Sequence, residues 1–147
     1  MSLADKISED LKEAMKRRDE RRVSCLRMLK SSLKNKQVEK GDKLNDDEIR
    51  SVIASLIRKG QEAVIEFQRG GRADLSGKEE EEIKILYQYL PEQLESDEIE
   101  RILRETISEL SAGGLKDLGR VMKAAMARMA GRAQGKEVNE IAKKLLS

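Results

Sequence analysis

The chain has 147 residues, of which 39% are charged and only 2% are aromatic, and its formal net charge is +2. It contains one cysteine, no histidine and no apolar run of the roughly 18 residues needed to span a bilayer. This composition excludes an internal disulfide, a histidine general base and a Cys–His nucleophile pair, and it predicts no membrane segment.

Apolar residues at helical spacing predict four helices in residues 1–90. The first three follow a residue whose side chain can cap a helix: Ser2, Asp19 and Asn45. The fourth should open near Asp74 or Ser76. Pro91 should end it, because the residue before a proline is driven out of the helical region. The expected helices cover residues 3–18, 20–40, 46–69 and 74–90.

Two residues within these helices have a predicted packing role. Gly60 falls on the apolar stripe of the third helix, where glycine normally costs about 1 kcal/mol. We therefore expect it to let another helix approach closely. Cys25 lies next to Leu26, and we interpret it as a buried thiol that acts as a small hydrophobe, the alternative being a reactive thiol.

Three shorter helices are predicted after Pro91. Glycine-containing loops at residues 111–114 and 131–135 separate them, and Asp117 is a candidate N-cap for the second of the three. The expected helices cover residues 97–110, 118–129 and 138–146.

No segment alternates apolar and polar residues over the length of a strand. The predicted fold class is therefore all-α. We expect two domains with a boundary at Pro91: an N-terminal four-helix bundle in residues 1–90 and a small three-helix domain in residues 91–147.

Residues that could carry chemistry are few. The acidic runs at residues 46–48 and 79–82 could bind Mg²⁺, but they are more simply solvated faces and favourable charges near helix N-termini. The glycine spacing matches neither a phosphate-binding loop nor a dinucleotide fingerprint. The sequence therefore predicts no catalytic residue, no metal site and no cofactor.

The positive charge is concentrated in two segments. Residues 16–43 carry a net charge of +7 and residues 115–147 a net charge of +5, whereas residues 91–114 carry −5. Such clusters can attract phosphates over a Debye length of roughly 8–10 Å, even when the total charge is small.

The two basic segments have different predicted roles. Residues 16–18 and 21–22 hold five cations, for which an ordinary solvated helix surface is the favoured interpretation. In the C-terminal segment acidic residues are scarce, and there RNA binding and an ordinary surface have equal weight. No aromatic residue accompanies either cluster, so recognition would be of backbone and shape rather than by base stacking. The C-terminal cations surround a glycine-flanked turn: Arg120, Lys123, Arg128, Arg132 and Lys136.

Methionines 122, 126 and 129 share one face of a predicted helix with Val121 and Ala125. They are expected in the core. Because methionine is also common on adaptable binding surfaces, a groove for a protein partner stays open as the alternative.

Three stretches carry a resemblance to a known family. They are residues 89–94 (Tyr-Leu-Pro-Glu-Gln-Leu), residues 117–124 and residues 131–133 (Gly-Arg-Ala). With them, nearly the whole chain resembles the YqeY-type proteins of the GatB/YqeY family. Residues from about 91 onward are similar to the tail domain of the B subunit of tRNA-dependent amidotransferases.

The resemblance implies a link to glutamine-dependent amidation of mischarged tRNA. In the larger enzyme the tail contacts tRNA, while the chemistry resides in other domains. A family label of carbon–nitrogen ligase with glutamine as amido donor would therefore come to this chain from the larger enzyme. Carried over by residue, the resemblance places tRNA contact on Gly119, Arg120, Lys123, Gly131 and Arg132.

The leading hypothesis is therefore a cytoplasmic, non-catalytic accessory module that binds tRNA through its C-terminal basic surface. The alternative is a helical adaptor that docks on an amidotransferase or another translation component. A third possibility, an enzyme in its own right, would require turnover of glutamine by the pure protein.

Overall fold

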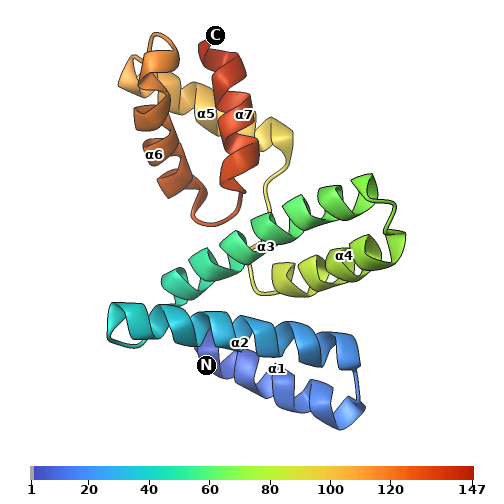
Figure 1. Cartoon of the computed structure of the whole chain (residues 1–147). Coiled ribbons are helices and arrows are strands. Elements are labelled where there is room, and N and C mark those ends of the chain that lie inside the picture. The colour runs from blue at the N-terminus through green and yellow to red at the C-terminus, as the bar shows by residue number, and fades with distance from the viewer. Residues whose placement is uncertain (1) are drawn as a thin grey trace. The chain divides into compact units, whose positions relative to one another are not determined.

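The computed structural model describes residues 2–147, and these residues form seven α-helices and one short 3₁₀ helix without a strand (Figure 1). The prediction of an all-α fold is confirmed. The helices are α1 (Leu3–Arg17), α2 (Glu20–Lys40), α3 (Asp46–Arg69), α4 (Ala73–Tyr87), α5 (Ser96–Leu110), η1 (Leu115–Asp117), α6 (Leu118–Met129) and α7 (Gly135–Leu146).

The first three helices start where the sequence predicts, because their caps form. The Ser2 hydroxyl accepts the Asp5 N–H at 3.2 Å, and the Asp19 carboxylate accepts the Arg22 N–H at 3.2 Å. Asn45 and Glu48 form a reciprocal capping box. Each such cap contributes about 1 kcal/mol to helix stability.

Helix α4 begins near Asp74, the first of the two predicted starts, but it ends earlier than predicted. The helix begins at Ala73, and Ser76 lies inside it, buried, with its hydroxyl donating to the Ala73 carbonyl. It ends at Tyr87 rather than at Leu90, since the next three residues close tighter turns with hydrogen bonds to the third residue back. The chain thus leaves the helix before Pro91 could interrupt it.

The start of α7 and the capping of α6 differ from expectation. Helix α7 begins at Gly135, three residues before Val138. Asp117 stands at the N-cap of α6, but its side chain does not cap that helix. Its carboxylate instead accepts the Gly113 N–H at 2.9 Å, across the loop that precedes η1.

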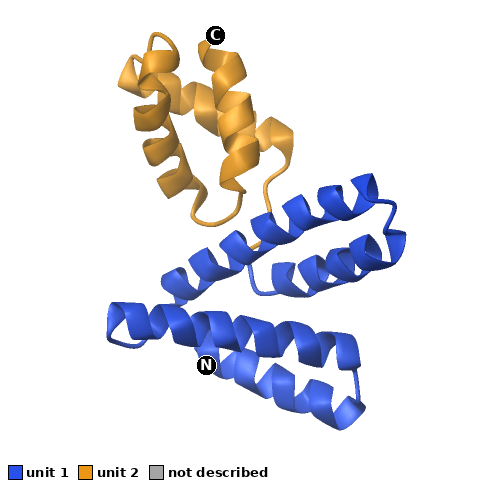
Figure 2. Ribbon diagram, in the orientation of Figure 1, with its two compact units in different colours: residues 1–90 blue, residues 91–147 orange. Residues whose placement is uncertain are grey.

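The chain forms two compact units, residues 1–90 and residues 91–147 (Figure 2), which we call unit 1 and unit 2. Helices α1–α4 build unit 1 and the remaining elements build unit 2. The core of unit 1 consists of Ile7, Cys25, Leu26, Leu29, Ile49, Ile53, Ile57, Ile85, Leu86 and Tyr89.

Gly60 is the close contact between α3 and α4. A Cβ atom at this position would lie 3.0 Å from Cγ1 and 3.2 Å from Cδ1 of Ile83. The prediction of a helix-packing glycine is confirmed. Because Gly60 has no side chain, Ile83 of α4 can pack directly against α3 at this point.

Unit 2 has a core of its own, in which α5, α6 and α7 meet. Met129 is fully buried there, and Met122 and Met126 pack against it half-buried. Packing in or against the core, as expected, is therefore the role that the structure shows for these methionines. The buried apolar residues are Leu94, Ile99, Leu103, Val121, Ala125, Met129, Ala133, Val138, Ala142 and Leu146.

Cys25 is fully buried, as expected, and its thiol donates to the Glu82 carbonyl at 3.6 Å. Burial, with the Glu82 carboxylate nearby, raises the pKa of Cys25 from 9.0 to about 12. We expect a thiol reagent to modify it in the native protein only through unfolding, because the reactive thiolate is suppressed. Comparing modification rates in buffer and in denaturant checks this.

The same pKa shift has a consequence for stability at high pH. The raised value means that the contribution of Cys25 is complete below about pH 9 and is lost as the pH rises toward 12. Stability should therefore fall above about pH 9, by up to roughly 1.4 kcal/mol per pH unit relative to Cys25→Ala. An unchanged difference between the two proteins in urea unfolding at pH 7 and pH 10 would contradict this.

Candidate nucleic-acid interface

The seven residues predicted to bind RNA all lie in unit 2 and are all exposed. They occupy α6, the turn after it and the first turn of α7: Gly119, Arg120, Lys123, Arg128, Gly131, Arg132 and Lys136. They differ in whether their side chains already make ion pairs or hydrogen bonds within the fold.

Lys123 and Lys136 carry free charge. Lys123 projects from α6 on the side away from Val121 and Ala125, which are buried. Lys136 lies in the first turn of α7. No ion pair involves either lysine among the residues that the structure describes. Both ammonium groups are therefore available to an anionic partner.

Arg120 and Arg128 are held by acidic neighbours. Arg120 pairs with Asp117 at 3.4 Å and donates to the Leu110 carbonyl at 3.1 Å. The Gly113 N–H, and the Arg120 guanidinium beside it, hold the pKa of Asp117 below its ordinary value. These contacts hold the 111–117 loop in place. They also make the Arg120 guanidinium less available to an anionic partner.

Arg128 joins α6 to α5. It pairs with Glu109 and donates to the hydroxyl of Thr106 at 3.2 Å. Thr106 is fully buried, and its hydroxyl in turn donates to the Ile102 carbonyl at 2.7 Å. Arg128 therefore has a structural role between α5 and α6, and its guanidinium is already paired with the Glu109 carboxylate.

Arg132 is fixed by the chain that enters unit 2. Its Nε donates to the Glu92 carbonyl at 3.0 Å, and its own carbonyl accepts the Leu94 N–H at 2.7 Å. Gln93 adds a bond of 3.1 Å to the Gly131 carbonyl. Two of the stretches that carry the family resemblance, residues 89–94 and 131–133, thus hold each other in place.

Arg132 is nevertheless available for binding through its two terminal nitrogens. Neither has a hydrogen-bond partner within the described part of the chain. The side chain is anchored at Nε and so presents a guanidinium edge that is already oriented. Such an edge suits a phosphate.

The two glycines of the predicted site have different roles. Gly131 adopts a φ of +79°, in the left-handed region that favours glycine, so the turn requires it. Gly119 lies in the first turn of α6, and a Cβ atom there would meet nothing within 4 Å. The fold does not demand glycine at this position.

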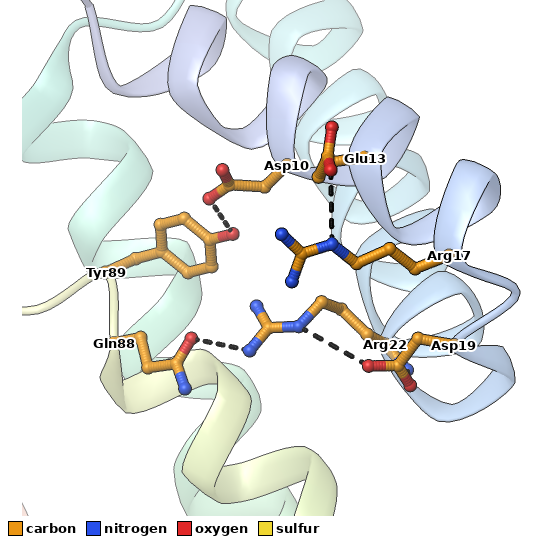
Figure 3. A network of polar contacts seen from close by, with 7 residues as sticks. All are labelled: Asp10, Glu13, Arg17, Asp19, Arg22, Gln88 and Tyr89. Atoms are coloured by element: carbon orange, nitrogen blue, oxygen red, sulfur yellow. Dashed lines mark hydrogen bonds and ion pairs between the residues drawn. The ribbon is translucent and has the colours of Figure 1, made fainter.

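Three of the five cations in the N-terminal basic cluster make ion pairs within unit 1, and Figure 3 shows two of them, Arg17 and Arg22. Arg17 bonds to Glu13 at 3.1 Å, and Arg22 lies 3.9 Å from Asp19 and bonds to Gln88 at 3.0 Å. Arg21 lies 3.4 Å from Glu81. Lys16 and Arg18 make no ion pair within the described residues, and the interpretation of this cluster as an ordinary helix surface stays a prediction.

The same region contains a polar contact that sequence reasoning missed. The Tyr89 hydroxyl donates to Oδ2 of Asp10 at 2.6 Å (Figure 3). Asp10 falls on the apolar stripe of α1, three residues after Ile7 and one before Leu11. A carboxylate on an apolar stripe was the signal that could have indicated a buried partner.

The acidic runs show no metal site. Within residues 2–147 no group of three or more possible ligands comes together. Residues 46–48 open α3, as predicted, but Glu82 is buried in α4 and not part of a solvated face. Burial, and then the charge of Glu79, raise the pKa of its carboxyl.

None of the described helices has the length and apolar character to cross a membrane.

Fold and surface define an all-helical protein with a small C-terminal unit whose lysines are free. Comparison with known proteins identifies its family: the model described as Yqey-like protein matches residues 4–146, and the chain belongs to that family.

Three curated relatives carry the name "Altered inheritance of mitochondria protein 41, mitochondrial". The chain is 26% identical to the one from Vanderwaltozyma polyspora over 120 residues, which are 76% of this chain and 64% of that protein. It is 38% identical to the one from Kluyveromyces lactis over 84 residues, 56% of this chain and 45% of that protein. For Lachancea thermotolerans the identity is 34% over 85 residues, 57% and 46% of the two chains. The matched region thus spans only about half to two thirds of these relatives.

These names contradict the expectation of a cytoplasmic protein, because the relatives are named as mitochondrial. The expectation rested on residues 1–6, which run straight into an amphipathic helical pattern instead of an apolar signal segment. Such a pattern does not specify a compartment.

Proposed function

We propose that unit 2 is a binding unit for folded RNA, with tRNA as the leading candidate. The observation that carries the proposal is the free charge of Lys123 and Lys136, together with the oriented guanidinium of Arg132. Lysine and arginine side chains at helix surfaces and turns are the usual contacts to phosphates. The resemblance to the tRNA-contacting tail of an amidotransferase supports the same partner.

The composition of unit 2 favours recognition of the backbone. Residues 91–147 contain no phenylalanine, tyrosine or tryptophan, so bases have no aromatic side chain to stack on. Folded RNA offers phosphates and 2′-hydroxyls in a fixed shape, which cationic side chains can read without stacking.

The test is tRNA binding by the full chain, measured by filter retention over a range of salt concentrations. Lys123→Glu/Lys136→Glu should weaken binding by about tenfold or more and reduce the log–log salt slope by about 2, because two phosphate contacts are lost. These lysines make no ion pair in the fold, so stability should not change. Failure of the wild-type protein to retain tRNA at low salt would refute the proposal.

A matched control comes from unit 1. Lys12 and Lys84 are also exposed helix lysines without an ion pair in the described structure, so Lys12→Glu/Lys84→Glu makes the same change in net charge. It should bind tRNA nearly as well as wild type. Equal losses in the two double variants would mean that only total charge matters, and the assignment to unit 2 would fail.

Gly119 offers a second, uncharged test. Gly77 in α4 is likewise a helix glycine at which a Cβ atom would meet nothing within 4 Å. Both Gly119→Ala and Gly77→Ala should leave the fold intact. If RNA approaches the first turn of α6 closely, only Gly119→Ala should weaken retention.

A further inference from the structure

Unit 1 has a groove at the edge of its core, between α1 and the last turns of α2. It encloses about 800 Å³ between the start of α1 and the last turns of α2, and Ala4, Ile7 and Leu33 lie along it. Val38 also lines the groove. Its side chain is 74% exposed, more than any other large apolar residue in the described part of the chain. A groove of this size with an apolar floor is of the kind that takes up a ligand or a partner segment.

The groove forms because the two helices differ in length. Helix α1 has 15 residues and α2 has 21, so at 1.5 Å per residue α2 is longer by roughly 9 Å. The N-terminus of α1 lies beside the middle of α2 (Figure 1), and the last turns of α2 extend past it. Val38, which lies beyond that point on α2, is left exposed.

Free positive charge surrounds this apolar floor. Lys30 and Lys34 lie on α2 at the spacing that puts them on the same face as Val38, and Lys43 follows the helix. None of the three lysines takes part in an ion pair within the described residues. The lining contains one carboxylate, Asp42, and it accepts the amide of Lys43 at 2.7 Å.

We infer that this groove binds an amphipathic helix of a partner protein, with leucine-type side chains on one face and glutamates or aspartates beside them. An apolar face on the partner would cover Val38 and Leu33, and its carboxylates would meet the three lysines. Nucleic acid fits less well, because phosphates and sugars gain nothing from an apolar floor. The site is separate from the RNA surface proposed for unit 2.

The test uses the full chain and a synthetic helical peptide as the probe. The peptide carries leucines at positions i, i+4 and i+7 flanked by glutamates, and its fluorescence anisotropy is followed on addition of protein. We expect saturable binding that a scrambled peptide of the same composition does not show. Lys30→Glu/Lys34→Glu should weaken binding by about tenfold or more, whereas the control Lys12→Glu/Lys84→Glu should not.

Val38→Asp supplies an independent check, since it alters the apolar floor and leaves the lysines in place. It too should weaken binding by about tenfold, and circular dichroism should show that each variant remains helical. No binding at about 1 mM peptide, or equal binding of the scrambled peptide, would overturn the inference. So would equal displacement of the peptide by tRNA or by vesicles of phosphatidylglycerol, because charge alone would then explain it.

The two proposals fail separately. Lys123→Glu/Lys136→Glu should bind the peptide as wild type does. Lys30→Glu/Lys34→Glu should retain tRNA. Loss of both activities in either variant would contradict the separation of the sites.

Discussion

Replacing Tyr89 by alanine is expected to lower the free energy of unfolding by roughly 3–5 kcal/mol, the range for loss of a buried aromatic side chain. Tyr89 is only 5% exposed and lies in the core of unit 1 with Cys25 and Leu86. Its removal leaves a cavity and takes away the donor to Asp10. Lys6 Nζ, which lies 5.8 Å from the ring centroid, also loses a contact. Urea unfolding followed by circular dichroism measures the effect.

Tyr89→Phe separates the ring from its hydroxyl. It keeps the aromatic volume and removes only the 2.6 Å bond to Asp10, so we expect a smaller loss of roughly 1–2 kcal/mol. Burial, and then the bond to Asp10, raise the pKa of Tyr89. The stability from the hydroxyl is therefore complete below the ordinary tyrosine pKa of about 10 and declines above it. Equal losses for Tyr89→Ala and Tyr89→Phe would show that packing is not the main contribution.

Gly60→Val is expected to lower the free energy of unfolding by roughly 1–3 kcal/mol, the cost of overpacking a close contact. Even a single Cβ atom would come within 3.0 Å of Ile83, and the two γ carbons of valine add more bulk. The strain should fall on the α3–α4 pair. Thermal or urea unfolding gives the magnitude.

Gly77→Val is the matched control, because Gly77 is a helix glycine that faces open space. Helix propensity changes similarly at both positions, so the difference between the two variants isolates the steric term. Combining Gly60→Val with Ile83→Ala should restore part of the loss by making room. Without that recovery, the contact with Ile83 would not be the cause.

Most of the helix pattern could be predicted from sequence because the relevant signals are local. The Ser2, Asp19 and Asn45 caps act within three residues of themselves, and all three form as expected. The end of α4 could not be predicted in this way. Tyr89 turns into the core of unit 1 and bonds to Asp10, 79 residues away, so a tertiary contact overrides the local helical tendency.

The candidate site was predictable only in part. Lysine and arginine positions can be read from the sequence, but whether their charge is free depends on the fold. Arg128 appeared equivalent to Lys123, yet it bonds to Thr106 and Glu109 on a neighbouring helix. The groove of unit 1 was not predicted, because it depends on how two helices of unequal length pack against each other and not on the lengths alone.

The hydrogen bonds between residues 92–94 and the turn at 131–132 determine how much of the chain before α5 belongs to unit 2. Those three residues precede α5, yet they are bonded to the turn between α6 and α7, and Leu94 lies in the core of unit 2. A piece cut at Ser96 would open that core, while a piece cut at Pro91 keeps every one of these bonds. Residues 91–147 therefore contain the contacts that close their own core.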